Sequence, residues 1–173
     1  MKSITRITLL FACMLGLSTL AAQDAPQLTR LQKEQLQVYR QISLLVRKGK
    51  TDQKMFFKEY YKYVAVSNKQ LELLNRQEAE KLKARAERVL NENKREMAQR
   101  LFAGAKMYYA MAEVNKAICE AYDKGSVGDM KKQLAAYMEV EAQMVQNGAK
   151  PFPREWFTTR EAEMVIKQLA QKK

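Results

Sequence analysis

Apolar side chains recur every three or four residues along most of this 173-residue chain, which is the spacing of one face of an α-helix. No glycine or proline occurs in the 54 residues between Gly49 and Gly104. Lysine, glutamate, arginine, glutamine, alanine and leucine dominate this stretch, and all are good helix formers. The pattern therefore predicts an all-α protein, an elongated bundle of about four to six helices.

Start and stop signals divide the chain into five expected helices. Pro26 and Gly49 bound the first of them, and Ser126 followed by Asp129 is typical of a capping box at the start of another. The expected helices cover residues 27–48, 52–91, 94–124, 127–147 and 158–171. The apolar face of the first helix is formed by Leu28, Leu31, Val38, Ile42 and Leu45, and is widened by Leu36 and Tyr39.

The second expected helix is unusually long. An unbroken helix over 51–91 would span about 60 Å, whereas a compact chain of this size has a diameter on the order of 40 Å. The domain is therefore elongated, or the helix breaks, with Ser67–Asn68 and Asn91–Asn93 as the expected positions. Within residues 76–100, 13 of 25 residues are charged, and the apolar residues form only a narrow seam. This pattern predicts a coiled-coil arm, through which the chain could form a homo-oligomer. The seam consists of Ala79, Leu82, Ala86 and Val89.

The first 21 residues have the organisation of a cleaved signal peptide. Lys2 and Arg6 precede an uncharged run over 7–20, and the small residues Thr19 and Ala21 fit the cleavage site. The run spans about 21 Å, too short for a hydrocarbon core of about 30 Å, so no transmembrane segment is expected in the mature chain. Lipid attachment at Cys13 is the alternative. We expect residues 22–173 to form a single domain that is periplasmic or secreted.

Composition excludes most catalytic chemistry. The chain has 31 Lys and Arg against 19 Asp and Glu, a net charge of +12, and it has no histidine to act as base or metal ligand. We therefore predict no catalytic, cofactor-binding or metal-ligating residue and no enzymatic activity. Cys119 is expected to be a small buried apolar residue, with an intermolecular disulfide as the alternative.

Positive charge is concentrated in the first half of the expected mature chain. Residues 22–100 carry a net charge of +8 and residues 101–173 a net charge of +2. A basic stripe on the first helix, with nearby aromatic residues, predicts a surface for an anionic envelope component or a protein partner. Nucleic acid is not expected, because export removes the chain from it. The candidate partner-binding residues are Arg30, Lys33, Arg40, Arg47, Lys48, Lys50, Phe56, Tyr60, Tyr63, Phe152 and Trp156.

Two simpler interpretations stand beside this one. The basic residues also fit a solvated helix face opposite the apolar stripe, and the aromatic residues also fit an ordinary core.

The segment from Leu28 to Gln32, with the sequence LTRLQ, resembles the LTxxQ motif of small basic all-α periplasmic chaperones of the Spy type. That family has a second copy of the motif, to which Phe157–Glu161 of this chain is a distant approximation. The resemblance implies a concave, positively charged and partly apolar surface that holds unfolded chains. A holdase of this kind is therefore the alternative function.

Overall fold

The structure is a computed structural model that describes residues 4–47 and 53–151, with side chains described from Pro26 onward. Within these ranges the chain forms four α-helices and no strand: α1 (Ile4–Arg47), α2 (Gln53–Asn91), α3 (Arg95–Asp123) and α4 (Val127–Gln146). The all-α prediction is confirmed. The helix expected over 158–171 lies outside the described residues.

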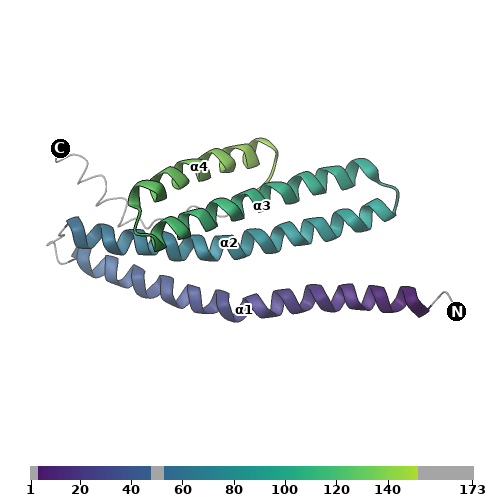
Figure 1. Cartoon of the computed structure of the whole chain (residues 1–173), viewed down its shortest axis with the longest axis horizontal. Helices are drawn as coiled ribbons and strands as arrows, with labels where there is room; N and C mark the ends of the chain where they lie inside the picture. The colour runs from purple at the N-terminus through teal and green to yellow at the C-terminus, as the bar shows by residue number, and fades with distance from the viewer. Residues whose placement is uncertain (1–3, 48–52, 152–173) are drawn as a thin grey trace.

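The helices form one elongated layer, in the order α1, α2, α3, α4 (Figure 1). Helices α2 and α3 pair antiparallel along their length, while α1 packs against α2 and α4 packs against α3. The expected seam lies inside this hairpin: Ala79 and Ala86 are fully buried, and a Cβ placed on Gly104 of α3 would lie 3.4 Å from Leu82 Cδ1. The seam is therefore covered by the chain's own α3.

Helix α2 is continuous from Gln53 to Asn91, so of the two alternatives the long helix is the one observed, and no break occurs at Ser67–Asn68. The Ser67 hydroxyl donates to the Tyr63 carbonyl oxygen at 2.8 Å, and Asn68 Nδ2 donates to the Val64 carbonyl oxygen at 2.8 Å. Both side chains thus bond to the preceding turn of their own helix, and both are buried. The chain turns after Asn91, where Asn93 adopts a φ of 61°, a left-handed conformation that asparagine tolerates.

Helix α1 begins well before the start that we expected after Pro26. Pro26 lies inside the helix, which runs from Ile4. A proline within a helix removes one backbone donor, and the leucines and alanines before it are good helix formers. The missing donor does not end the helix here, since α1 extends to Arg47.

The start of α4 confirms Ser126 as its N-cap, but the reciprocal half of the expected capping box is absent, because the Ser126 backbone N–H donates to the Ala121 carbonyl oxygen at 2.9 Å. The Asp129 backbone N–H donates to Ser126 Oγ at 3.3 Å, and the Ser126 hydroxyl donates to Asp129 Oδ2 at 2.7 Å. This hydrogen bond, together with the nearby Lys132 ammonium, lowers the pKa of the Asp129 carboxyl. The cap fixes where α4 leaves the α3–α4 turn.

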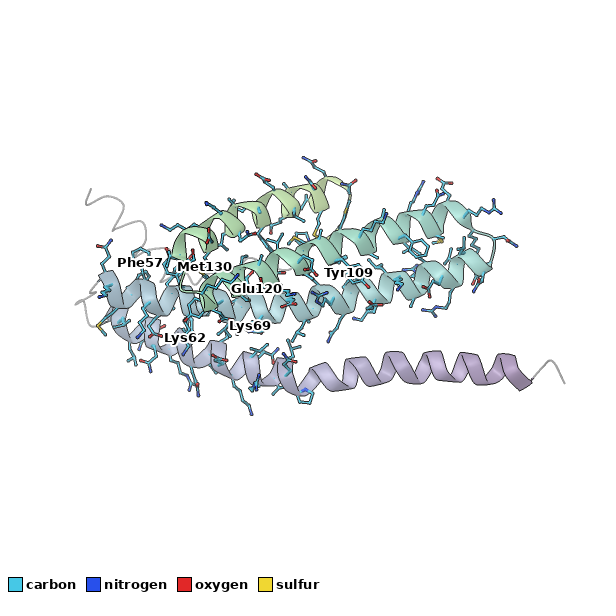
Figure 2. All side chains as sticks on the ribbon, in the orientation of Figure 1. Phe57, Lys62, Lys69, Tyr109, Glu120 and Met130 are labelled. Carbon is cyan, nitrogen blue, oxygen red and sulfur yellow. The ribbon has the colours of Figure 1, made fainter. Side chains whose placement is uncertain are left out.

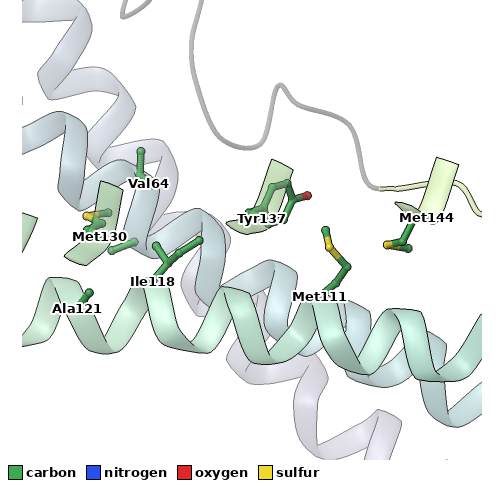
Figure 3. Packing of buried hydrophobic residues seen from close by; sticks show 8 residues of the cluster. Val64, Met111, Ile118, Ala121, Met130, Tyr137 and Met144 are labelled. Carbon is green, nitrogen blue, oxygen red and sulfur yellow. The ribbon is translucent and has the colours of Figure 1, made fainter. Parts of the chain in front are cut away.

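The main core joins α2, α3 and α4 (Figure 3). It is rich in methionine, whose flexible side chain fills irregular gaps. Its buried members are Val64, Ala65, Met111, Ile118, Ala121, Met130, Tyr137 and Met144. A second, smaller core joins α1 to α2 and consists of Val38, Ile42, Phe56 and Tyr63.

Three buried asparagines link α2 to α3. Asn75 Nδ2 donates to Asn115 Oδ1 at 2.9 Å, and Asn115 Nδ2 donates to Asn68 Oδ1 at 2.8 Å. Asn115 therefore bridges two α2 residues that lie seven positions apart. Because a shifted pairing would leave these amides without partners in a dry interior, the asparagine bridge fixes the register of the α2–α3 hairpin.

Candidate partner-binding surface

Five residues of α1 form one exposed row, which we call the α1 outer stripe. Its members follow the three-and-four spacing of a helix face: Lys33, Leu36, Arg40, Leu44 and Arg47. All five are exposed, and the opposite side of the same helix carries the buried residues Leu31, Val38 and Ile42. The α1–α2 core thus turns the stripe outward, to the side of α1 that faces away from α2.

Apolar and basic side chains alternate along the stripe. Leu36 is 48% exposed and Leu44 is 49% exposed, and each lies between two cations in the row. Neither Lys33, Arg40 nor Arg47 forms an ion pair with a carboxylate of the described residues. The stripe therefore offers unneutralised positive charge beside accessible apolar surface.

Leu36 corrects the sequence interpretation, which assigned it to the buried face. It lies only two residues from Val38, and residues at that separation point to different sides of a helix. Leu44 was not singled out by the sequence analysis. Its spacing to Arg40 and Arg47 was the available signal, because four and three residues place all of them on one face.

A hollow of about 370 Å³ adjoins the C-terminal half of the stripe. Its lining combines two stripe cations, a leucine and a hydroxyl: Tyr39, Arg40, Ser43, Leu44, Val46 and Arg47. Ser43 Oγ is buried and has no hydrogen-bond partner among the described residues. The hollow therefore has both charged and apolar walls.

Arg30 lies apart from the stripe, in a groove of about 350 Å³ between α1 and α2. This groove also holds Glu34, Lys69 and Glu72, so its charges largely balance. Arg76, which also lines the groove, has its Nη2 atom 3.2 Å from Glu72 Oε1 and 2.8 Å from Glu113 Oε1. The positive potential is therefore weaker here than along the α1 outer stripe.

The aromatic candidates occupy the α1–α2 core. Phe56 is fully buried and Tyr63 is buried, so their placement on a binding surface was wrong. Tyr60 is half-buried and stacks on Phe56 with ring centroids 6.1 Å apart. The helical spacing that made these residues a cluster in the sequence also places them against Ile42 of α1.

Four further candidates, Lys48, Lys50, Phe152 and Trp156, lie outside the described residues.

Cys119 is buried, as expected, and its thiol donates to the Ala65 carbonyl oxygen at 3.4 Å. Burial raises the pKa of this thiol to about 12. The thiol therefore stays protonated near neutral pH, the form that is poorly nucleophilic.

No three Cys, Asp or Glu side chains of the described part of the chain are grouped so that they could hold a metal ion. None of the helices within residues 4–47 and 53–151 has an apolar stretch long enough to cross a membrane. Comparisons of the chain with protein-family models, with curated proteins and with solved structures found no match.

Proposed function

We propose that this chain is an exported, non-enzymatic binding protein that holds an anionic partner of the cell envelope on the α1 outer stripe. The observation that carries the proposal is the single exposed row of alternating cations and leucines on the side of α1 opposite its core. A fully solvated helix face would not need leucines between its charges.

The spacing of the cations suits an extended anionic surface. Lys33, Arg40 and Arg47 are each seven residues apart, so they rise along α1 in steps of about 10 Å. Long-range attraction, which salt screens, brings the partner to this row. Leu36 and Leu44 then add short-range apolar contact between the charged positions.

Replacing the three cations together by glutamine (K33Q, R40Q and R47Q) is expected to weaken binding to vesicles containing phosphatidylglycerol by roughly 100-fold. Each basic residue near an anionic surface contributes about 1 kcal/mol, and about 1.4 kcal/mol corresponds to a tenfold change. Co-sedimentation with vesicles at low and high salt measures the effect.

The matched control replaces three exposed lysines of α3 and its C-terminal end (K106Q, K116Q and K124Q), which changes the net charge equally. This control should bind far better than the α1 variant. Equal losses in both variants, or vesicle binding undiminished at high salt, would contradict a specific role for the stripe. Binding only to an acidic protein, with no vesicle binding, would assign the stripe to a protein partner.

The exposed leucines favour a holdase as the second candidate function. Beside cations, Leu36 and Leu44 present the mixed surface on which a cationic, partly apolar chaperone would hold unfolded chains. The double variant L36S and L44S is then expected to lose most of the suppression of aggregation that the unaltered chain gives to an unfolding client. Light scattering measures the aggregation of the client with and without each variant. Absence of suppression by the unaltered chain in excess would remove the candidate.

A further inference from the structure

A second exposed row, apolar apart from Lys131, runs along α4, and we call it the α4 side stripe. It follows helical spacing over residues that are all exposed: Val127, Lys131, Ala135, Met138, Ala142 and Val145. Met138 and Val145 are 56% and 57% exposed, more than any other large apolar side chain of the described residues. The stripe is about 27 Å long from Val127 to Val145.

The α4 side stripe is separate from the face that α4 gives to the core. Met130, Tyr137 and Met144 are buried against α2 and α3. Helix α4 lies at the edge of the layer, with α3 as its neighbour, and its side chains project outward from that edge (Figure 2). The stripe is thus a second apolar face on a helix whose core face is already satisfied.

We propose that the α4 side stripe pairs with the same stripe of a second copy of the chain, with the two helices antiparallel. The stripe is self-complementary in shape, because small and large residues alternate: Ala135 of one copy would lie opposite Met138 of the other. Small residues allow the two helices to approach closely, and the thioether fills the space they leave.

Charges beside the stripe select the antiparallel direction. Lys132 and Glu139 lie seven residues apart on the same flank. Antiparallel pairing places Lys132 of each copy near Glu139 of the other, whereas parallel pairing would put these two flanks on opposite sides of the interface and would set Lys131 against Lys131. Within one copy Lys132 Nζ is 3.7 Å from Asp129 Oδ1, an exposed contact that contributes little and is easily exchanged.

The length of α4 limits the strength of this association. A single pair of 20-residue helices buries less surface than the roughly 1,200 to 2,000 Å² of a standard stable interface. We therefore expect a reversible dimer whose population grows with protein concentration. Its interface is distinct from the α1 outer stripe, which stays exposed in both copies.

Sedimentation velocity of the purified full chain over a wide range of concentrations tests the proposal. The unaltered chain should show a monomer–dimer equilibrium. M138K and E139K should each weaken the dimer affinity by at least tenfold. M138K places a charge at the centre of the interface, and E139K removes the ion pair between Lys132 of one copy and Glu139 of the other. The double variant K132E and E139K exchanges both charges and should recover most of the dimer. Q99K, which adds a charge on exposed α3 far from α4, should leave the equilibrium unchanged.

Three results would overturn the proposal. They are a chain that stays monomeric at every concentration, association that is unchanged in both M138K and E139K, and failure of the double charge exchange to recover the dimer. Because these positions are exposed, circular dichroism should show unchanged helix content in every variant, so a loss of the dimer reports on the interface.

Discussion

Replacing Phe56 by alanine is expected to lower the free energy of unfolding by about 4 kcal/mol, the usual cost of removing a fully buried phenylalanine. Phe56 has no exposed surface and lies in the core that joins α2 to Val38 and Ile42 of α1. It also stacks on Tyr60 and meets Phe57 edge to face, with ring centroids 5.4 Å apart. The truncated side chain would leave a cavity at the centre of this small core.

Urea unfolding followed by circular dichroism measures this effect. Met55, the neighbouring residue, is exposed, so M55A is the matched control and should change the free energy of unfolding by less than about 0.5 kcal/mol. A loss below about 1 kcal/mol for F56A would show that the α1–α2 core contributes little. The variant also connects the core to the proposed function, because loosening α1 should weaken vesicle binding although every residue of the α1 outer stripe is retained.

Asn115→Ala is expected to lower the free energy of unfolding by about 3 kcal/mol, chiefly because it takes the Asn115 partner from one polar atom in each of two buried amides. The substitution removes the acceptor for Asn75 Nδ2 and the donor to Asn68 Oδ1. All three asparagines are buried, so water cannot replace the lost hydrogen bonds without opening the interface. Thermal or urea unfolding measures the loss.

Two companion variants separate the asparagine bridge from general effects of shortening a side chain. Gln99 lies on the exposed part of α3, so Q99A should cost little. The triple variant N68L, N75L and N115L removes every member of the bridge and should recover stability relative to N115A, since no amide of the bridge is then left unsatisfied. An N115A variant as stable as Q99A would contradict the role of the bridge.

Local signals in the sequence were enough for much of the secondary structure. The N-cap role of Ser126 was predictable because a helix start depends on side chains within one turn of it. The all-α fold was predictable because helix-forming composition and helical periodicity agreed over long stretches. The burial of Cys119 followed from its position on an apolar helix face.

Signals that depend on a neighbouring helix misled the sequence analysis. Ser67 and Asn68 are poor helix residues by propensity, but their side chains bond to the preceding turn while the surrounding core holds α2 straight. Phe56 and Tyr63 were candidates for a surface because aromatic clusters suit both binding and cores. Only the position of α1 over them decided that they are buried.

The sequence by itself determined that this chain is helical, where one of its helices is capped, and that its excess positive charge lies in the first half of the proposed mature chain. These properties depend on composition and on contacts within a turn or two of helix. The tertiary structure decided which side of each helix is covered. It joined Asn68, Asn75 and Asn115, and it left Leu36 and Leu44 of α1 and Met138 of α4 exposed. A side chain is buried only when a second surface packs against it. The residue pattern of one helix specifies the surface of that helix and does not show which neighbour will cover it.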